Sequence, residues 1–179
     1  MSNFNPQFAK IGEVLIFNNL ISEDQLNEAL SEQKTTKGKL GHILIKNGLI
    51  TEEDLTNAYS QQTGNKTISE EDLLKANLEV TNLLSEDFAK EKNIIALNKS
   101  DSSIIIAMED PEDLSTIDSI KKLTKLNPEI LISGKSHIEK ALEILYDKIK
   151  KSDEVESAIS NISIIKGDEE DGDELDLAT

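Results

Sequence analysis

The sequence predicts an α+β protein in which an N-terminal helical module of two repeated helical hairpins precedes a small ββαβα subdomain. Two observations predict this class: a 24-residue segment with helical periodicity occurs twice near the start, and β-branched runs alternate with helical patterns further on. We expect three regions, which are the repeat module at 1–66, the α+β subdomain at 67–150 and an acidic disordered linker or tail at 151–179.

The first region contains one motif in two copies. Residues 10–33 read KIGEVLIFNNLISEDQLNEALSEQ, residues 39–62 read KLGHILIKNGLITEEDLTNAYSQQ, and the two agree at 12 of 24 positions without a gap. In each copy, apolar residues at i, i+3 and i+4 predict a short helix, and an Asn- or Gly-containing turn follows. An N-cap residue, Ser22 or Thr51, then opens a second helix. Each hairpin is too small to hold a core alone, so the two should pack together.

The second region mixes helical and strand patterns. Ser69 and Ser85 are expected to cap two short helices, and two β-branched runs around a Ser-Asp-Ser turn predict a β-hairpin. Pro111 is placed to begin a helix, and Pro128 precedes a third strand. The predicted elements are helices at 69–74 and 85–92, strands at 94–99 and 103–108, a helix from 110–111, a strand at 129–133 and a helix at 136–150.

Charge excludes several classes of function. The chain has 19 Lys, no Arg and 35 Asp or Glu, which gives a net charge of −16. Nucleic acid and anionic membranes repel such a chain, so we expect neither DNA nor RNA as a partner. No apolar run reaches the ~18 residues that span a bilayer, and the start lacks the pattern of a signal peptide. We therefore expect a cytoplasmic protein without direct membrane insertion. The acidic block at 167–176 predicts a disordered linker.

The residues offer no catalytic or metal-binding constellation. Cysteine is absent, and His42 and His137 are the only histidines. Thiolate chemistry is thereby excluded, and a histidine-rich metal site is disfavoured. We expect no enzymatic activity, no metal and no cofactor from these residues.

Three recurring residues in each copy go beyond an apolar helix stripe. A lysine and a glutamine stand at opposite ends of the stripe, where packing gives no evident reason for them. A glycine stands at the start of each first helix, where it costs ~1 kcal/mol relative to alanine. This cost indicates that another group approaches the backbone closely. The residues alone leave open whether they bind a ligand or only fold the hairpins. They are Lys10, Gly12 and Gln33, and Lys39, Gly41 and Gln62.

The motif pair resembles the tandem 24-residue motif of the MshEN domain, the N-terminal domain of many assembly ATPases of type II secretion and type IV pili. The family motif begins Arg/Lys-Leu-Gly and runs through leucines to a closing glutamine, as both copies do. The AMEDP phrase at 107–111 and the closing helix also resemble that region, so the resemblance covers roughly residues 8–150. Lysine stands here where arginine is frequent, and Asn19 where the first turn normally has glycine.

This resemblance implies a regulatory domain that binds cyclic di-GMP, either of a pilus or secretion ATPase whose motor is absent from these residues or of a free-standing sensor. It implies cyclic di-GMP as the ligand and inner-membrane platform, pilus or secretion proteins as partners, with a place at the inner membrane through them. The alternative is a protein–protein docking domain for that platform without nucleotide binding. The implied binding residues are Lys10, Ile11, Gly12, Leu26, Leu30 and Gln33, and Lys39, Leu40, Gly41, Leu55, Tyr59 and Gln62.

Overall fold

The computed structural model describes the backbone of residues 4–178 and the side chains of residues 4–161. It confirms the α+β class. The described elements are the 3₁₀ helix η1 (Pro6–Phe8), α1 (Ile11–Phe17), α2 (Glu23–Thr36), α3 (Leu40–Lys46), α4 (Glu52–Thr63), α5 (Glu70–Leu73), α6 (Leu78–Thr81), α7 (Glu86–Lys92), β1 (Ile94–Lys99), β2 (Ser103–Met108), α8 (Leu114–Thr124), β3 (Asn127–Ile132) and α9 (Lys135–Ala178).

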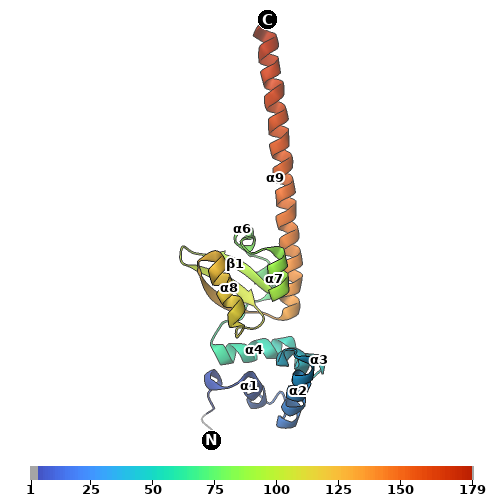
Figure 1. Cartoon of the computed structure of the whole chain (residues 1–179), viewed down its shortest axis with the longest axis vertical. Coiled ribbons are helices and arrows are strands. Elements are labelled where there is room, and N and C mark those ends of the chain that lie inside the picture. The colour runs from blue at the N-terminus through green and yellow to red at the C-terminus, as the bar shows by residue number, and fades with distance from the viewer. Residues whose placement is uncertain (1–3, 179) are drawn as a thin grey trace.

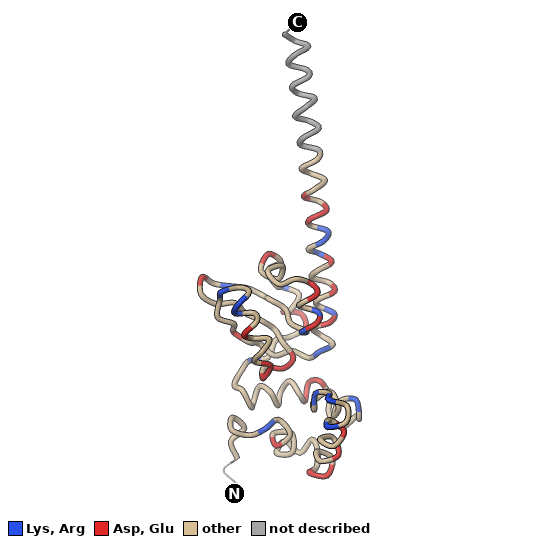
Figure 2. The backbone as a smooth tube through the Cα atoms, viewed as in Figure 1, with Lys and Arg blue, Asp and Glu red and all other residues tan. Residues whose placement is uncertain are grey.

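The molecule has a helical end, a sheet-containing middle and a projecting helix (Figure 1). The four helices α1–α4 form the end, and α9 passes beside the sheet before it projects away from the body. Acidic residues are spread over all three parts (Figure 2). No helix in the described part combines the length and the hydrophobicity needed to cross a bilayer.

The two hairpins pack crosswise with approximate twofold symmetry. α1 packs on α4, and α2 packs on α3. The 29-residue offset between the motifs relates α1 to α3 and α2 to α4, so the two packed pairs are equivalent. Two hydrogen bonds obey the same symmetry. Asn18 Nδ2 donates to Gln61 Oε1 at 2.8 Å, and Asn47 Nδ2 donates to Glu32 Oε2 at 3.0 Å. The first helix of each motif is therefore held by the second helix of the other.

Local signals place the caps and turns of the module as predicted. The side chains of Ser22 and Thr51 accept hydrogen bonds from backbone N–H groups three residues later, at 3.1 Å in both copies. The turns have φ of 60° at Asn19 and 75° at Gly48. Asparagine thus supplies in the first copy the left-handed backbone that glycine supplies in the second.

The motif glycines are required by close packing inside each hairpin. A Cβ on Gly12 would lie 2.7 Å from Leu26 Cδ1, and one on Gly41 would lie 2.6 Å from Leu55 Cδ2. The close neighbour that the sequence indicates is therefore a leucine of the same motif. Helix–helix approach alone accounts for both glycines.

A three-stranded sheet, ordered β1-β2-β3, forms the middle of the molecule. β1 and β2 are antiparallel neighbours joined by a tight turn, whereas β3 returns parallel to β2 after α8. Both edges are protected against pairing with another chain. Thr81 Oγ1 donates to the Ala96 carbonyl at 2.7 Å beside β1, and Ile132 of β3 exchanges backbone bonds with Lys66 and Ile68. Ile132 is fully buried and packs into the core of the helical module, which joins the two parts.

Two predicted boundaries in the middle of the chain are displaced. α8 begins at Leu114 instead of 110–111, because Asp113 caps it by accepting from the Thr116 N–H at 3.2 Å and the Thr116 hydroxyl at 2.6 Å. β3 begins at Asn127 and includes Pro128. The Asn127 N–H donates to the carbonyl of Ser102, just before β2, so Pro128, which has no N–H group, stands at a position that faces away from β2. The short elements η1 and α6 have no counterpart among the predicted elements.

The last helix continues beyond its predicted end. α9 spans Lys135–Ala178, whereas the sequence predicts a helix end at Lys150 and a disordered linker at 151–179. No proline stands in this segment, and no glycine stands between Lys151 and Lys166, so nothing there ends a helix.

Replacing Gly41 by alanine should destabilise the module more than replacing Gly12. Leu55 is 5% exposed and would have to shift within the core or toward the small cavity of about 180 Å³ that it lines, whereas Leu26 is only half-buried and can rotate toward solvent. We expect Gly41→Ala to lower the free energy of unfolding by about 1–3 kcal/mol in urea denaturation, and Gly12→Ala by less. Gly38→Ala is the matched control, because its nearest neighbour would be 3.5 Å away. An unchanged stability for Gly41→Ala would contradict this packing account.

Candidate functional site

A groove opens where the two motifs meet. Its volume is about 830 Å³, within the ~300–1,000 Å³ typical of small-molecule sites. η1, α1, α2, α3 and α4 line it from the helical module, and the loop between β2 and α8 lines it from the sheet side. It brings together ten of the twelve residues that the sequence analysis selected: Lys10, Ile11, Gly12, Leu26, Leu30, Gln33, Lys39, Leu40, Tyr59 and Gln62.

The other two selected residues, Gly41 and Leu55, do not line this groove. Gly41 is buried against Leu55, and Leu55 lines a smaller cavity of about 180 Å³ that includes Glu109, Ser133 and residues of the β3–α9 turn. In the described structure, the sheet-containing part packs on this hairpin through β3 on α4 and through the bond from Ser136 to Glu52. The approximate symmetry of the module is therefore lost in the groove.

The recurring glutamines fix the backbone in front of the motif lysines. Gln33 Nε2 donates to the carbonyl of Gly38 at 3.1 Å, and Gln62 Nε2 donates to the carbonyl of Ala9 at 3.0 Å. Each acceptor belongs to the residue just before the lysine of the other motif copy. The expectation that packing gives no reason for these glutamines is therefore wrong.

Gln62 also carries an unused acceptor. The residue is 7% exposed, and its Oε1 has no hydrogen-bond partner among the described residues. A buried acceptor without a partner costs ~1–3 kcal/mol. Gln62 lines the groove, but its Oε1 atom is itself buried.

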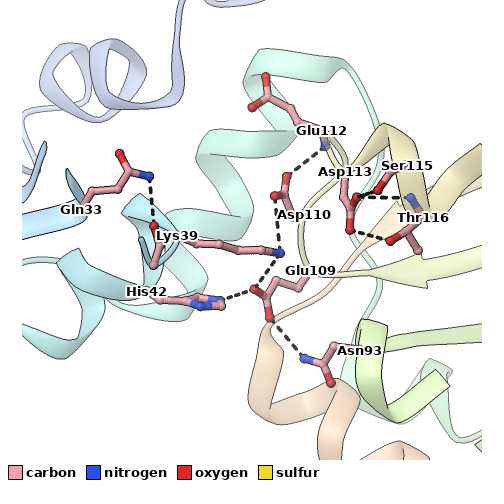
Figure 3. Close-up of polar contacts among 11 residues, drawn as sticks. Gln33, Lys39, His42, Asn93, Glu109, Asp110, Glu112, Asp113, Ser115 and Thr116 are labelled. Carbon is pink, nitrogen blue, oxygen red and sulfur yellow. Dashed lines mark hydrogen bonds and ion pairs between the residues drawn. The ribbon is translucent and has the colours of Figure 1, made fainter. Parts of the chain in front are cut away.

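The two motif lysines have different surroundings. Lys39 Nζ lies 3.6 Å from Asp110 Oδ2 and 3.9 Å from Glu109 Oε1, both in the loop after β2 (Figure 3). The Lys39 side chain is 48% exposed, so these pairs add little stability and leave the ammonium accessible. Lys10 forms no ion pair within the set of side chains that the structure describes.

The loop after β2 brings carboxylates to the groove that the sequence analysis did not select. Asp110 and Glu112 both line it, and the Glu112 N–H donates to Asp110 Oδ1 at 3.0 Å. Burial, then the charge of Asp110, raises the pKa of Glu112. Burial, followed by the charges of Asp110, Glu112 and Glu109, raises the pKa of Tyr59. The groove thus combines ammonium groups with carboxylate acceptors, of which Asp110 alone lies in the AMEDP phrase.

A polar network beside the groove joins the loop to the module. His42 Nε2 contacts Glu109 Oε1, while Asn93 Nδ2 donates to Glu109 Oε2 at 3.2 Å (Figure 3). A second connection runs from the hydroxyl of Ser136 to Glu52 at 2.5 Å. The His42–Glu109 contact ties the loop after β2 to the helical module, and the Ser136–Glu52 bond ties the start of α9 to it. Among the described side chains, no three His, Asp or Glu residues are grouped so as to hold a metal ion.

Further groove residues lie outside the selected set. Most of them precede or follow a motif, so their contact with the groove depends on the packing of η1 on α4. They are Gln7, Phe8, Ala9, Glu13 and Thr63.

Known proteins are similar to this chain both in its sheet-containing part and over most of its length. Residues 69–151 match the MshEN domain model, so the match lies on the sheet-containing part and not on the motif pair. The chain is 31% identical to the type IV pilus assembly ATPase PilB of Myxococcus xanthus (strain DK1622). This alignment extends over 168 residues and covers 93% of this chain. The chain spans 30% of the length of that relative.

Two solved structures share the fold. A structure of MshE with cdg (cyclic di-GMP) is 27% identical, with a TM-score of 0.68, and the alignment covers 77% of this chain and 99% of that one. Residues 67–179 make up less than 77% of the chain, so the alignment also includes part of the helical module. The N-terminal domain of XpsE is 21% identical, with a TM-score of 0.66 over 80% of this chain and 97% of that one, and shows likeness of fold alone.

The chain thus shares its fold with the MshE structure and with the N-terminal domain of XpsE, and its sequence is similar to part of an assembly ATPase of type IV pili. Residues 69–151, just under half of the chain, match the MshEN domain. The resemblance stated from the sequence is thereby confirmed.

Replacing Glu112 by glutamine should change how stability depends on pH. A carboxyl whose pKa is raised in the folded state binds more protons there than in the unfolded chain, so stability falls as the pH rises from the usual glutamate pKa of about 4.3 through the raised value. We expect Glu112→Gln to raise the melting temperature at pH 7 and to have a smaller effect at pH 4, measured by circular dichroism. Glu91→Gln, an exposed residue outside the groove, is the control. A larger gain at pH 4 would refute this assignment.

Proposed function

We propose that the domain binds cyclic di-GMP in this groove and regulates an assembly ATPase of type IV pili or type II secretion. The observation that carries the proposal is that one groove gathers residues of both motif copies, including both lysines. The likeness to MshE, whose structure was solved with cdg, supports the same ligand. In this proposal the domain acts in the cytoplasm, and platform, pilus or secretion proteins are its partners.

The groove matches the phosphates and the flat bases of this ligand. Cyclic di-GMP has two phosphates and two guanines. The ammonium groups of Lys10 and Lys39 can each form an ion pair with one phosphate. Ile11, Leu30 and Leu40 offer apolar surface to a base. A cation over a ring face adds ~0.5–2 kcal/mol. A twofold ligand also suits a module built with approximate twofold symmetry.

The acceptors in the groove favour guanine over adenine. Guanine carries an N2 amino donor that adenine lacks. Asp110 and Glu112 supply carboxylate acceptors within the same groove. The carboxylates repel the phosphates of the ligand, but they can accept hydrogen bonds from its guanine bases.

Ligand binding has to compete with an existing ion pair. Lys39 is paired with Asp110 at 3.6 Å, and a phosphate has to replace that carboxylate to bind the same ammonium. The phosphate contact is electrostatic and partly exposed, so added salt should weaken binding.

The alternative function is docking to a platform protein without nucleotide. It is favoured by the structural roles of the motif residues, because Leu26 and Leu55 explain the glycines and the Ala9 and Gly38 carbonyls explain the glutamines. In that case the repeat serves folding alone, and the groove binds no dinucleotide.

Titration calorimetry separates these two functions. We expect the parent protein to bind cyclic di-GMP, and Lys10→Ala and Lys39→Ala each to weaken binding about tenfold or more, because each removes a charged phosphate contact. Lys46→Ala is the matched control, since Lys46 is exposed and lies outside the groove. Absence of binding heat in a parent protein shown to be folded would leave only the docking function.

Cyclic di-AMP tests the recognition of the bases. It keeps both phosphates and both ring faces, but adenine has one amino donor, at N6, in place of the adjacent N1–H and N2 donors of guanine that a carboxylate can accept together. We expect its affinity to be at least tenfold lower than that of cyclic di-GMP in parallel titrations. Equal affinities would mean that Asp110 and Glu112 take no part in recognition.

A further inference from the structure

Phe8 is an exposed aromatic ring on the edge of the groove. It is 88% exposed, the highest value among the large apolar residues of the described part, and it lines the groove together with Lys10 and Gln62. The core of the module takes other residues of the same segment, Phe4 and Ala9, and does not include Phe8. Packing of the module therefore gives no reason for this ring.

The backbone that carries Phe8 is fixed on both sides. The Gln7 N–H donates to Asn5 Oδ1 at 3.0 Å, and the Ala9 N–H donates to the Pro6 carbonyl at 3.2 Å. The carbonyl of Ala9 accepts from buried Gln62 at 3.0 Å. Because the backbone is fixed, the freedom that Phe8 loses on contact with a ligand is limited to the rotation of its side chain.

Among the described residues that line the groove, no other aromatic ring is exposed in this way. Tyr59 also lines it but is only 6% exposed. Both motif cations are lysines, and the chain has no arginine. A guanidinium plane stacks on a base, whereas an ammonium group lacks such a plane. Stacking in this groove is therefore left to Phe8.

We propose that Phe8 stacks on one guanine of the bound dinucleotide. This inference rests on the proposed function and extends it to a residue outside both motif copies. The position equivalent to Phe8 in the second copy, 29 residues later, is Lys37, which has no ring. The two guanines are therefore bound unequally, one against an aromatic face and one without it.

A tryptophan at position 8 tests the contact directly. The chain has no tryptophan, so Phe8→Trp introduces a single indole. Stacking on guanine should quench its fluorescence saturably as cyclic di-GMP is added. Phe17→Trp is the matched control, because Phe17 is 54% exposed, does not line the groove and lies against Phe4. Equal quenching of both variants, or quenching of neither although the ligand binds, overturns the stacking.

Affinities of further variants separate stacking from general apolar contact. We expect Phe8→Ala and Phe8→Leu to bind about 5- to 100-fold more weakly than the parent protein, Phe8→Trp to retain affinity, and melting temperatures to stay unchanged. If the parent binds and Phe8→Leu binds equally well, the stacking proposal fails and the proposed function stands. If the folded parent does not bind cyclic di-GMP at all, both fail.

Discussion

The crosswise hydrogen bonds of Gln33 and Gln62 are the constraint on which the module depends. Each glutamine lies in the second helix of one motif and holds the carbonyl in front of the lysine of the other. Both lysines enter one groove because of this exchange, together with the packing of α1 on α4 and α2 on α3. A hairpin alone would have neither the core nor the acceptor for its glutamine, which explains why the motif occurs as a pair.

The sheet-containing part makes this nearly symmetric module asymmetric. The loop after β2 adds Asp110 and Glu112 to the groove and pairs Asp110 with Lys39, and no equivalent loop faces Lys10 in the described structure. The same part covers Leu55, whereas its counterpart Leu26 stays in the groove. η1 adds Phe8 on one side only. The groove is thus formed by both parts of the protein, and its chemistry differs from end to end.

Local signals in the sequence predicted what local physics determines. Capping by Ser22 and Thr51 and the limits of β1 and β2 depend on neighbouring residues, and the structure has them as predicted. The start of α8 was misplaced because Asp113 outcompetes the earlier Asp110-Pro111 signal. The motif glycines correctly indicated a close approach, but their spacing alone does not distinguish a ligand from a leucine. The groove contacts of Phe8 and Glu112 bring together residues far apart in the chain, which no local pattern reports.

Amide NMR of isotope-labelled protein during addition of cyclic di-GMP tests the central claim most directly, because it reports on both motifs and the carboxylate loop at once. The account predicts saturable shifts, with one ligand per chain, at Lys10, Gly12, Lys39 and Glu112 together, and little change along α9. Shifts confined to one motif copy, or located away from the groove, would contradict it.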